Sequence, residues 1–326
     1  MSPRYSLIVP VYRNEESISE LLAAVASMNR ELEGRLEFVC VVDGSPDRSA
    51  ERLRELLPSL GLDAKLILLS RNFGSFAAIR EGLLHARGEF SAVMAADLQE
   101  PPELVLEFFR RMERNDIDVM FGVREAREDP LVSRMLAGAF WWIYRRFVQR
   151  DVPVGGVDVF AVNRVFRERV VAFGEANGSL LGLLFWMGGR RDFVPYNRLK
   201  RAHGKSAWTF GKKFTYLLDS IFAFTDAPIR LLLGAGLLGL VLSMAFGVAI
   251  IFSKLAGLQQ VPGYAATVLS VLFFGGLNAL GLGLVGNYAW RAYENTKHRP
   301  LSIPMLIEDF GGAAAKTHSD RATQSL

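Results

Sequence analysis

Cysteine and histidine are scarce in this sequence. Among its 326 residues there are one cysteine, Cys40, and four histidines. A single cysteine excludes a disulfide within the chain, and the lack of any cysteine and histidine cluster argues against a zinc site. Cys40 lies in an apolar stretch typical of a strand, so we expect it to be an unreactive core residue.

Two common phosphate-binding motifs are missing as well. The first 205 residues contain no Gly-x-Gly-x-x-Gly, and the chain has no complete Gly-x-x-x-x-Gly-Lys-Ser/Thr loop. These absences argue against a dinucleotide-dependent dehydrogenase and a P-loop NTPase. The formal net charge is only +4, and the basic residues are not interleaved with aromatics along one stripe, so we expect no nucleic-acid partner. The apolar run at 7–11 is too short for a signal peptide, so we expect none.

Charged side chains are absent from two long apolar stretches near the C-terminus, at 231–253 and 255–290. Each exceeds the ~20 residues needed to cross a bilayer. Gly257, Pro262 and Gly263 indicate a short turn between them. We therefore predict a transmembrane hairpin with spans at about 230–252 and 264–287. The alternative, a buried helical pair in a globular core, is disfavoured by these lengths.

The distribution of basic residues predicts how the hairpin is oriented. Nine lysines and arginines lie between 190 and 230, before the first span, and Arg291, Lys297 and Arg299 follow the second. The connecting loop carries only Lys254. Because positive charge stays on the cytoplasmic side, we expect a multi-pass protein of the inner membrane whose N-terminal region and C-terminus face the cytosol.

Strand and helix patterns alternate in the N-terminal region. Buried strands are predicted at Tyr5–Val11, Leu36–Val42, Ala64–Leu69, Phe90–Ala96 and Val119–Gly122. Helices are predicted at Ser17–Glu31, Arg48–Leu57, Phe76–Ala86 and Pro102–Arg114. Ser17 and Glu20 form a capping box for the first helix, and Asp47 is the expected N-cap of the second. This alternation predicts an α/β fold with a doubly wound, mostly parallel sheet.

Two further segments, Met135–Val148 and Trp208–Phe224, combine aromatic residues with lysine and arginine. That combination is typical of helices that lie at the headgroup level of a membrane, although an ordinary core-facing helix is the alternative. We divide the chain into a cytosolic α/β domain at 1–205, an interfacial helix at 206–228, the hairpin at 229–290 and a cytosolic tail at 291–326. Residues 313–326 have the composition of a disordered polar tail.

The most informative segment is Asp97–Glu103, where an apolar run ends at a carboxylate, an amide and a Pro-Pro turn. Ligands of open α/β sheets bind at the carboxyl ends of strands, so Asp97 is expected at a binding cleft. A carboxylate there can hold a divalent cation against a diphosphate. The alternative is that Asp97 only caps the helix that follows.

Three other polar loops follow predicted strands, at Pro10–Glu16, Asp43–Asp47 and Ser70–Gly74. Each brings polar groups to the same sheet edge, as a nucleotide site requires. Asp43 can accept hydrogen bonds from a base or ribose, and the turn at Gly44 and Ser45 lets the backbone approach a ligand closely. Arg71 and Asn72 complete the predicted nucleotide-binding set.

With these residues in view, the chain resembles family 2 glycosyltransferases, in particular the branch with dolichyl-phosphate mannose synthases and bacterial polyprenyl-phosphate glucosyltransferases. The resemblance covers nearly the whole chain. Its motifs are Val9–Tyr12, Asn14–Glu16, Val42–Ser45, Ser70–Gly74, Asp97–Glu103, Val194–Tyr196 with Arg198 and Arg201, and Gly286–Tyr288 with Arg291.

This resemblance implies a GT-A fold, a nucleoside-diphosphate sugar donor, Mg²⁺ or Mn²⁺ and an inverting displacement, and we favour a UDP-sugar. It implies that Pro10, Tyr12, Glu15 and Asp43 surround the nucleoside. Asp97 and Gln99 are then expected near the diphosphate, metal and sugar. The acceptor is expected to be polyprenyl phosphate, such as undecaprenyl phosphate, in a bilayer, and we also expect a homo-oligomer.

Three features depart from the family pattern. Ala95 stands where the family usually has the first acid of Asp-x-Asp, and Phe160 stands where this branch usually has an arginine. Residues 177–179 lack a basic residue often found there. These departures indicate a divergent subgroup with a different sugar, or a weakened enzyme.

A lipid phosphate is ionised at cytosolic pH, so it can attack a sugar without a strong general base, and catalysis depends on positioning and on stabilising the leaving diphosphate. Candidates for holding that phosphate are Arg124, Arg134, Arg198 and Arg201, because guanidinium binds phosphate bidentately. Headgroup contact or a solvated surface is the alternative for each. Asp158 is a candidate base or a partner that orients an arginine, and equally a structural acid.

Other functions stay open. The same fold can transfer to a hydroxyl of a lipid-linked oligosaccharide, which requires a base and therefore gives Asp158 more weight. Ala95 motivates a third hypothesis, a degenerate membrane scaffold without catalysis.

Overall fold

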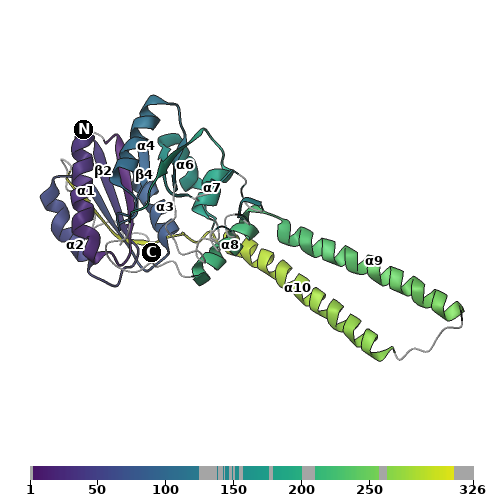
Figure 1. Cartoon of the computed structure of the whole chain (residues 1–326). Helices are drawn as coiled ribbons and strands as arrows, with labels where there is room; N and C mark the ends of the chain where they lie inside the picture. Colours follow the sequence, from purple (N-terminus) through teal and green to yellow (C-terminus); the bar gives the residue numbers. More distant parts are fainter. Residues whose placement is uncertain are drawn as a thin grey trace.

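A computed structural model describes residues 3–124, 138, 142, 144–146, 149, 151–153, 157–175, 179–199, 210–256 and 263–311. An α/β domain carries a long arm of two antiparallel helices (Figure 1). The arm leaves the domain beside α8 and consists of α9 and α10.

The described strands form one sheet in the order β7-β5-β6-β4-β1-β2-β3-β8. Their bounds are β1 Tyr5–Val11, β2 Leu36–Val42, β3 Asp63–Leu69, β4 Phe90–Val93, β5 Val119–Arg124, β6 Val157–Asn163, β7 Arg191–Tyr196 and β8 Pro304–Phe310. The pairs β1–β2, β1–β4, β2–β3 and β5–β7 are parallel, whereas β3–β8, β4–β6 and β5–β6 are antiparallel. The sheet is therefore more mixed than the sequence predicts.

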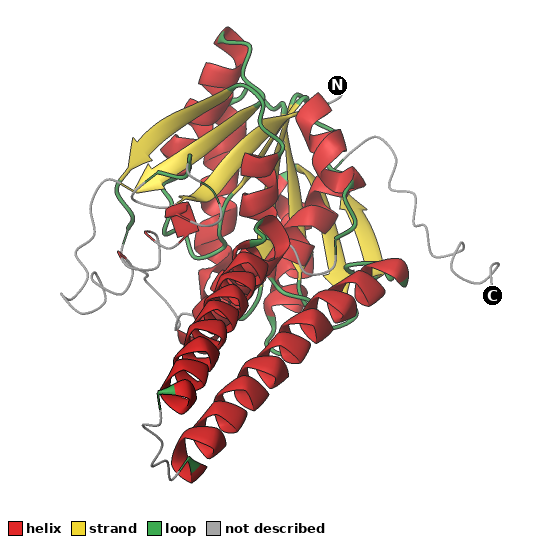
Figure 2. Ribbon diagram, turned by 90° about the vertical axis from the view of Figure 1, so that its right-hand side faces the viewer, coloured by secondary structure: helices red, strands yellow, loops and turns green. Residues whose placement is uncertain are grey.

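Helices cover both faces of this sheet (Figure 2). Their bounds are η1 Glu15–Ser17, α1 Ile18–Glu31, α2 Ser49–Leu56, η2 Leu57–Leu60, α3 Ser75–His85, α4 Pro102–Arg114, α6 Arg164–Ala172, α7 Leu180–Trp186, α8 Phe210–Phe224, α9 Ala227–Leu255 and α10 Tyr264–Thr296. One core cluster contains residues of α1, α2 and α4, and the other contains residues of α3, α6 and α7. Strands β1 and β2 lie between the two layers and are buried almost throughout, which explains their continuous apolar sequences.

The predicted apolar face of α1 is confirmed, since Ile18, Leu21, Leu22, Val25 and Met28 are all buried. The predicted capping box is wrong. The Ser17 hydroxyl donates to the Asn14 carbonyl (3.1 Å) and makes no cap bond, because a turn of 3₁₀ helix precedes α1. The second helix begins at Ser49 with Arg48 at the N-cap position, so Asp47 is not its N-cap.

The segment after the hairpin, predicted as a tail at 291–326, contributes a strand. β8 pairs antiparallel with β3, with Ile307 opposite Ile67. Ion pairs Arg54–Glu308 and Lys65–Asp309, both 2.8 Å, fasten it further. A pairing partner more than 230 residues away gives no local sequence signal, and for this reason the strand is not predicted from the sequence.

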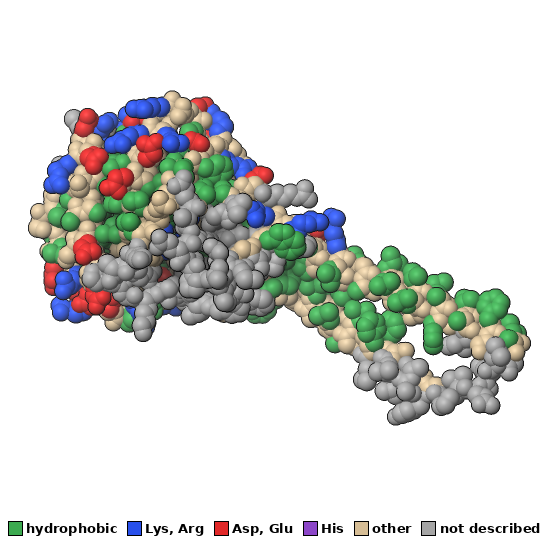
Figure 3. Space-filling view, viewed as in Figure 1, with side chains coloured by type: hydrophobic (Ala, Val, Ile, Leu, Met, Phe, Trp, Pro, Cys, Tyr) green, Lys and Arg blue, Asp and Glu red, His purple; other side chains and the backbone are tan. Residues whose placement is uncertain are grey.

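The arm is apolar along its length (Figure 3). Among the described residues one helix is long and apolar enough to cross a membrane, at Ala227–Ser253. Only 6% of its most apolar stretch is buried within the protein. This helix coincides with the first predicted span. α8 docks on the domain through Tyr216, whose hydroxyl lies 2.6 Å from Ser179 Oγ and whose ring lies 5.8 Å from that of Phe76.

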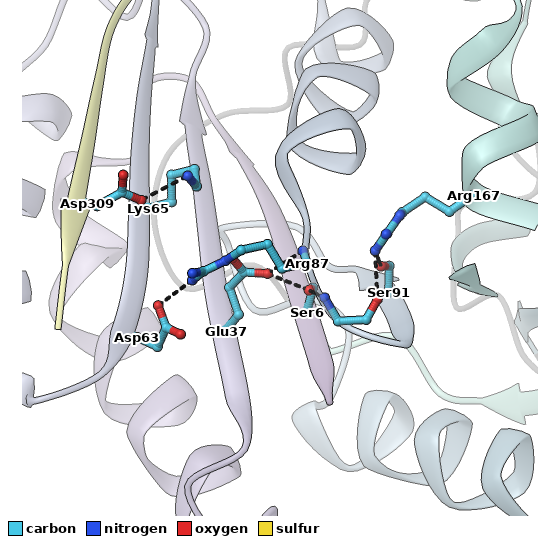
Figure 4. Close-up of polar contacts among 9 residues, drawn as sticks. Ser6, Glu37, Asp63, Lys65, Arg87, Ser91, Arg167 and Asp309 are labelled. Atoms are coloured by element: carbon cyan, nitrogen blue, oxygen red, sulfur yellow. Dashed lines mark hydrogen bonds and ion pairs between the residues drawn. The ribbon is translucent and has the colours of Figure 1, made fainter. Parts of the chain in front are cut away.

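A polar network fastens the amino edge of the sheet (Figure 4). The Glu37 carboxylate is fully buried and accepts from Ser6 Oγ (2.6 Å) and from Arg87 Nε (2.6 Å). Arg87 also contacts Asp63 (2.6 Å), so one guanidinium connects the starts of β2 and β3. These paired and hydrogen-bonded charges connect the starts of neighbouring strands. The candidate site lies at the opposite edge, where the parallel strands end.

Candidate functional site

The predicted loops meet at the carboxyl edge of the sheet. Strands β1, β2, β3 and β4 are mutually parallel, so the loops after them lie along one edge. β5 and β7 run the same way, because β6 is antiparallel to both β4 and β5. The structure therefore brings the predicted nucleotide residues to the same edge as Asp97, Arg124 and Arg198.

Asp43 braces the centre of this edge. Its side chain is buried, with 2% exposed, and accepts from the backbone N–H groups of Phe73 (2.7 Å) and Gly74 (2.8 Å). Burial raises the pKa of the Asp43 carboxyl, although these two hydrogen bonds and the nearby Arg71 oppose the rise. Asn72 Nδ2 donates to the Asp43 carbonyl (3.2 Å). The β2 loop thus orders the β3 loop.

Gly44 permits the closest contact between these two loops. Its φ is +56°, and an added Cβ would lie 2.3 Å from the carbonyl carbon of Arg71 and 2.4 Å from the nitrogen of Asn72. In this structure the close backbone approach at Gly44 joins two loops, and the predicted approach to a ligand stays a prediction. Arg71 and Asn72 are exposed, and the Arg71 guanidinium lies 4.0 Å from the centre of the Phe73 ring.

The β1 and β2 loops are joined through Asp47. Ser45 Oγ donates to its carboxylate (2.6 Å) and in turn accepts from the Arg13 N–H (2.8 Å), while the Glu15 N–H donates to Asp47 (3.1 Å). Burial alone would raise the pKa of Asp47, but hydrogen bonds led by those from Ser45 and Ser49 lower it overall. Asp47 is thus a loop brace, a role that the helix-cap interpretation missed.

Pro10, Tyr12 and Glu15 line the same region. Pro10 and Tyr12 are half-buried at the end of β1, and Arg13, with φ +56°, places its guanidinium 5.4 Å from the centre of the Tyr12 ring. Glu15 accepts from the Arg48 N–H (3.2 Å). Non-glycine residues at positive φ are strained and cluster at functional sites.

Asp97 does not cap the helix that follows it. α4 begins at Pro102, its N-cap residue is Pro101, and Asp97 Oδ1 accepts instead from the Gln99 N–H (3.3 Å). Leu98 between them has φ +52°, which makes the turn tight. Asp97 is half-buried and lies four residues after the end of β4.

Glu100, within the Asp97–Glu103 segment, supports this loop from inside. It is buried, with 3% exposed, and its Oε2 accepts from the Ala95 N–H (3.2 Å). Position 95 is where the family usually has an acid, and here a buried carboxylate binds its backbone. The signal available in the sequence was the second acid three residues after Asp97.

Gln99 joins the Asp97 loop to the segment after β7. Its side-chain Nε2 donates to the Leu199 carbonyl (3.3 Å), and the Leu199 N–H donates to the Gln99 carbonyl (2.9 Å). Arg198 Nη2 donates to Gln99 Oε1 (2.5 Å). The predicted acceptor residue Arg198 is thereby placed against the predicted metal loop.

The other predicted residues are placed unequally. Arg124 ends β5 and lies opposite Tyr196 of β7. Asp158 lies near the start of β6 at the same edge, where the register shifts so that it has no counterpart in β5. Such bulges are over-represented next to active sites. The Asp158 side chain, Arg134 and Arg201 lie outside the described residues.

The donor set fits a divalent cation that a substrate helps to hold. Within the part of the chain that the structure describes, no group of three or more His, Cys, Asp or Glu side chains gathers. Mg²⁺ is commonly bound by one or two carboxylates plus substrate phosphates, so the carboxylate of Asp97, completed by phosphate oxygens and water, is compatible with it.

Comparison with known proteins places the chain. A family model described as glycosyl transferase family 2 matches residues 6–172. An uncharacterized glycosyltransferase of Synechocystis is 30% identical, over 96% of this chain and 97% of its own. The bactoprenol glucosyl transferase of Shigella phage SfV is 30% identical, over 92% and 97%. The undecaprenyl-phosphate 4-deoxy-4-formamido-L-arabinose transferase of Edwardsiella ictaluri is 31% identical, over 90% and 91%.

Proposed function

Since the chain belongs to glycosyl transferase family 2 and is thus a glycosyltransferase, we propose that it transfers a sugar from a nucleoside-diphosphate sugar to polyprenyl phosphate in a membrane. Two relatives carry bactoprenol or undecaprenyl phosphate in their names, which supports the acceptor class. A UDP-sugar is the favoured donor, undecaprenyl phosphate the favoured acceptor, and cell-envelope glycans the destination of the product.

One observation carries this proposal: the helical arm returns to the edge where the candidate site lies. The Ser70 N–H, in the loop after β3, donates to the carbonyl of Ile303 (2.9 Å), and the neighbouring Ser302 hydroxyl donates to Glu81 (2.6 Å). Ile303 comes seven residues after the end of α10. An acceptor held in a bilayer around the arm would therefore reach the donor loops without leaving the membrane surface.

The surface of α9 supports a membrane location. Its exposed large side chains include Leu231, Leu237, Met244, Phe246 and Phe252, each at least 60% exposed. Soluble monomers rarely expose apolar patches of more than a few hundred Å². We propose that α9 and α10 both cross the inner membrane, and that the catalytic domain faces the cytoplasm, where the basic residues before α9 also lie.

The proposed chemistry divides the site in two. Pro10, Tyr12, Glu15 and Asp43, with the loops at 44–45 and 71–72, would bind the nucleoside. Asp97 would hold Mg²⁺ or Mn²⁺, which when bound stabilises the charge of the leaving diphosphate, and Gln99 lies beside it. Arg124 and Arg198, with Arg134 and Arg201, would orient the acceptor phosphate for inverting attack on the anomeric carbon. The Asp43 brace keeps the donor loops ordered, so that little reorganisation is needed.

A second candidate is transfer to a sugar hydroxyl of a lipid-linked acceptor. The observation that favours it is the register shift at Asp158, because a hydroxyl nucleophile requires a base at this edge. The product separates the two functions, since mild acid releases the label as a free monosaccharide from a lipid phosphate sugar but within an oligosaccharide from an extended lipid-linked acceptor.

The test uses the full chain in detergent with undecaprenyl phosphate, Mn²⁺ or Mg²⁺, and a panel of radiolabelled nucleotide sugars. A thermal-shift screen of the same sugars first identifies the donor, because a ligand that binds the folded state raises its Tm. We expect a lipid product from which mild acid releases the labelled monosaccharide, and no product from Asp97→Asn. Transfer to a hydroxyl, or binding of a donor without any transfer by the wild type, would contradict the proposal.

A further inference from the structure

The side-chain amide of Gln99 has a fixed orientation. Because Nε2 donates to the Leu199 carbonyl (3.3 Å), Oε1 is the atom that faces Arg198, and it accepts from Nη2 at 2.5 Å. The backbone bond between Leu199 N–H and Gln99 O (2.9 Å) holds the two chain segments at this separation. Both polar ends of the amide are therefore engaged with the segment that follows β7.

This contact restricts the rotamers of an exposed side chain. Arg198 is exposed, and an arginine carries about 2 kcal/mol of rotamer entropy that binding must overcome. Gln99 is itself held, since its N–H donates to Asp97 Oδ1 (3.3 Å) through the tight turn at Leu98. One residue thus links the carboxylate of Asp97 to the guanidinium of Arg198.

We propose that Gln99 is a positioning residue for the acceptor phosphate, which it serves by holding Arg198 beside the Asp97 loop. This inference rests on the proposed function and assigns Gln99 a role distinct from direct ligation of the cation. A neutral amide suits the role, because it directs the guanidinium without neutralising it, whereas a carboxylate at position 99 would pair with Arg198 and compete with the phosphate.

The test is a double-mutant cycle on the full chain in detergent, with Gln99→Met, Arg198→Ala and the double variant. Gln99→Met keeps the length of the side chain and removes both polar groups. We expect it to raise the apparent KM for undecaprenyl phosphate roughly tenfold, the effect of losing a hydrogen bond to a charged group. The KM for the donor and the Mn²⁺ requirement should change less than about twofold, since ground-state binding of the acceptor alone is lost.

Non-additivity is the decisive result. If Gln99 acts through Arg198, the double variant should have the acceptor KM of Arg198→Ala alone. Gln99→Glu should also raise the acceptor KM, and this defect too should disappear in the Arg198→Ala background. A Tm equal to that of the wild type, both without and with nucleotide, would confirm that each variant is folded.

Three outcomes would overturn the inference. Additive effects would show that Gln99 does not act through Arg198. A raised Mn²⁺ requirement with an unchanged acceptor KM would make Gln99 a ligand of the cation. Affinity for farnesyl phosphate, measured by calorimetry without donor, is a readout that needs no turnover. If the wild type transfers sugar and yet Gln99→Met binds this lipid phosphate equally well, the positioning role is wrong while the proposed function stands.

Discussion

Replacing Gly44 by alanine should separate the two loops that form the donor side of the site. A methyl group there would lie 2.3 Å from the carbonyl carbon of Arg71, and backbone cannot move aside as a flexible side chain can. A left-handed conformation costs a non-glycine residue about 1–2 kcal/mol, and forced overpacking costs about 1–3 kcal/mol more. We therefore expect Gly44→Ala to lose about 2–5 kcal/mol of stability.

Gly34 offers a matched control. It also has positive φ, +74°, but an added Cβ would meet no atom within 4 Å. Gly34→Ala should therefore cost only the conformational part, about 1–2 kcal/mol. The difference between the two variants isolates the clash between the loops at Gly44 and Arg71.

The assay is thermal unfolding of the full chain in detergent, with and without UDP. The Tm of Gly44→Ala should fall by roughly 5–15 °C, and that of Gly34→Ala by about 2–8 °C. Only Gly44→Ala should also lose part of the Tm increase that UDP produces, because displacing Arg71 disturbs the N–H groups that Asp43 holds. If both variants shift Tm equally and respond equally to UDP, the packing argument is refuted.

Three other changes test separate parts of the structure. Asp97→Asn should lower transfer by at least about 100-fold while Tm changes little, and activity near that of the wild type would remove Asp97 from the cation site. Asp47→Asn should have a lower free energy of unfolding than the wild type at neutral pH. Because the folded-state pKa of Asp47 lies below 3.8, this deficit should persist above that pH and vanish as the pH falls through the folded-state pKa. A deficit that does not change with pH would contradict the assignment. Glu37→Ala should cost about 1–3 kcal/mol, because Ser6 Oγ and the Arg87 N–H lose their buried acceptor while the half-exposed Arg87 guanidinium keeps Asp63, and no measurable loss would show that the network contributes little.

The sequence predicts best where the structure depends on local patterns. β1, β2 and α4 have the predicted bounds, because continuous apolar runs and a Pro-Pro start leave few alternatives. It predicts less well where a remote segment decides. The Asp47 carboxylate accepts from the Ser49 N–H at the start of α2, and the approach of the Glu15 backbone makes it a brace between loops as well.

The site follows the same rule. That Asp43 and Asp97 share a sheet edge follows from alternating strands and helices. That Gln99 contacts Arg198 does not, since the two are 99 residues apart and meet through an irregular segment after β7. The bulge at Asp158 likewise depends on the pairing of β6 with β5, which no single segment specifies.

The pairing of β8 with β3 requires the arm to cross a membrane an even number of times. Both strands belong to one sheet, so the chain before α9 and the chain after α10 must end on the same side of any bilayer that the arm enters. If α9 crosses, α10 has to cross back. The ribosome also makes β8 after both helices, so the free edge of β3 stays unpaired throughout synthesis of the arm. The sheet is complete only when β8 has returned to the side of the membrane on which β3 lies.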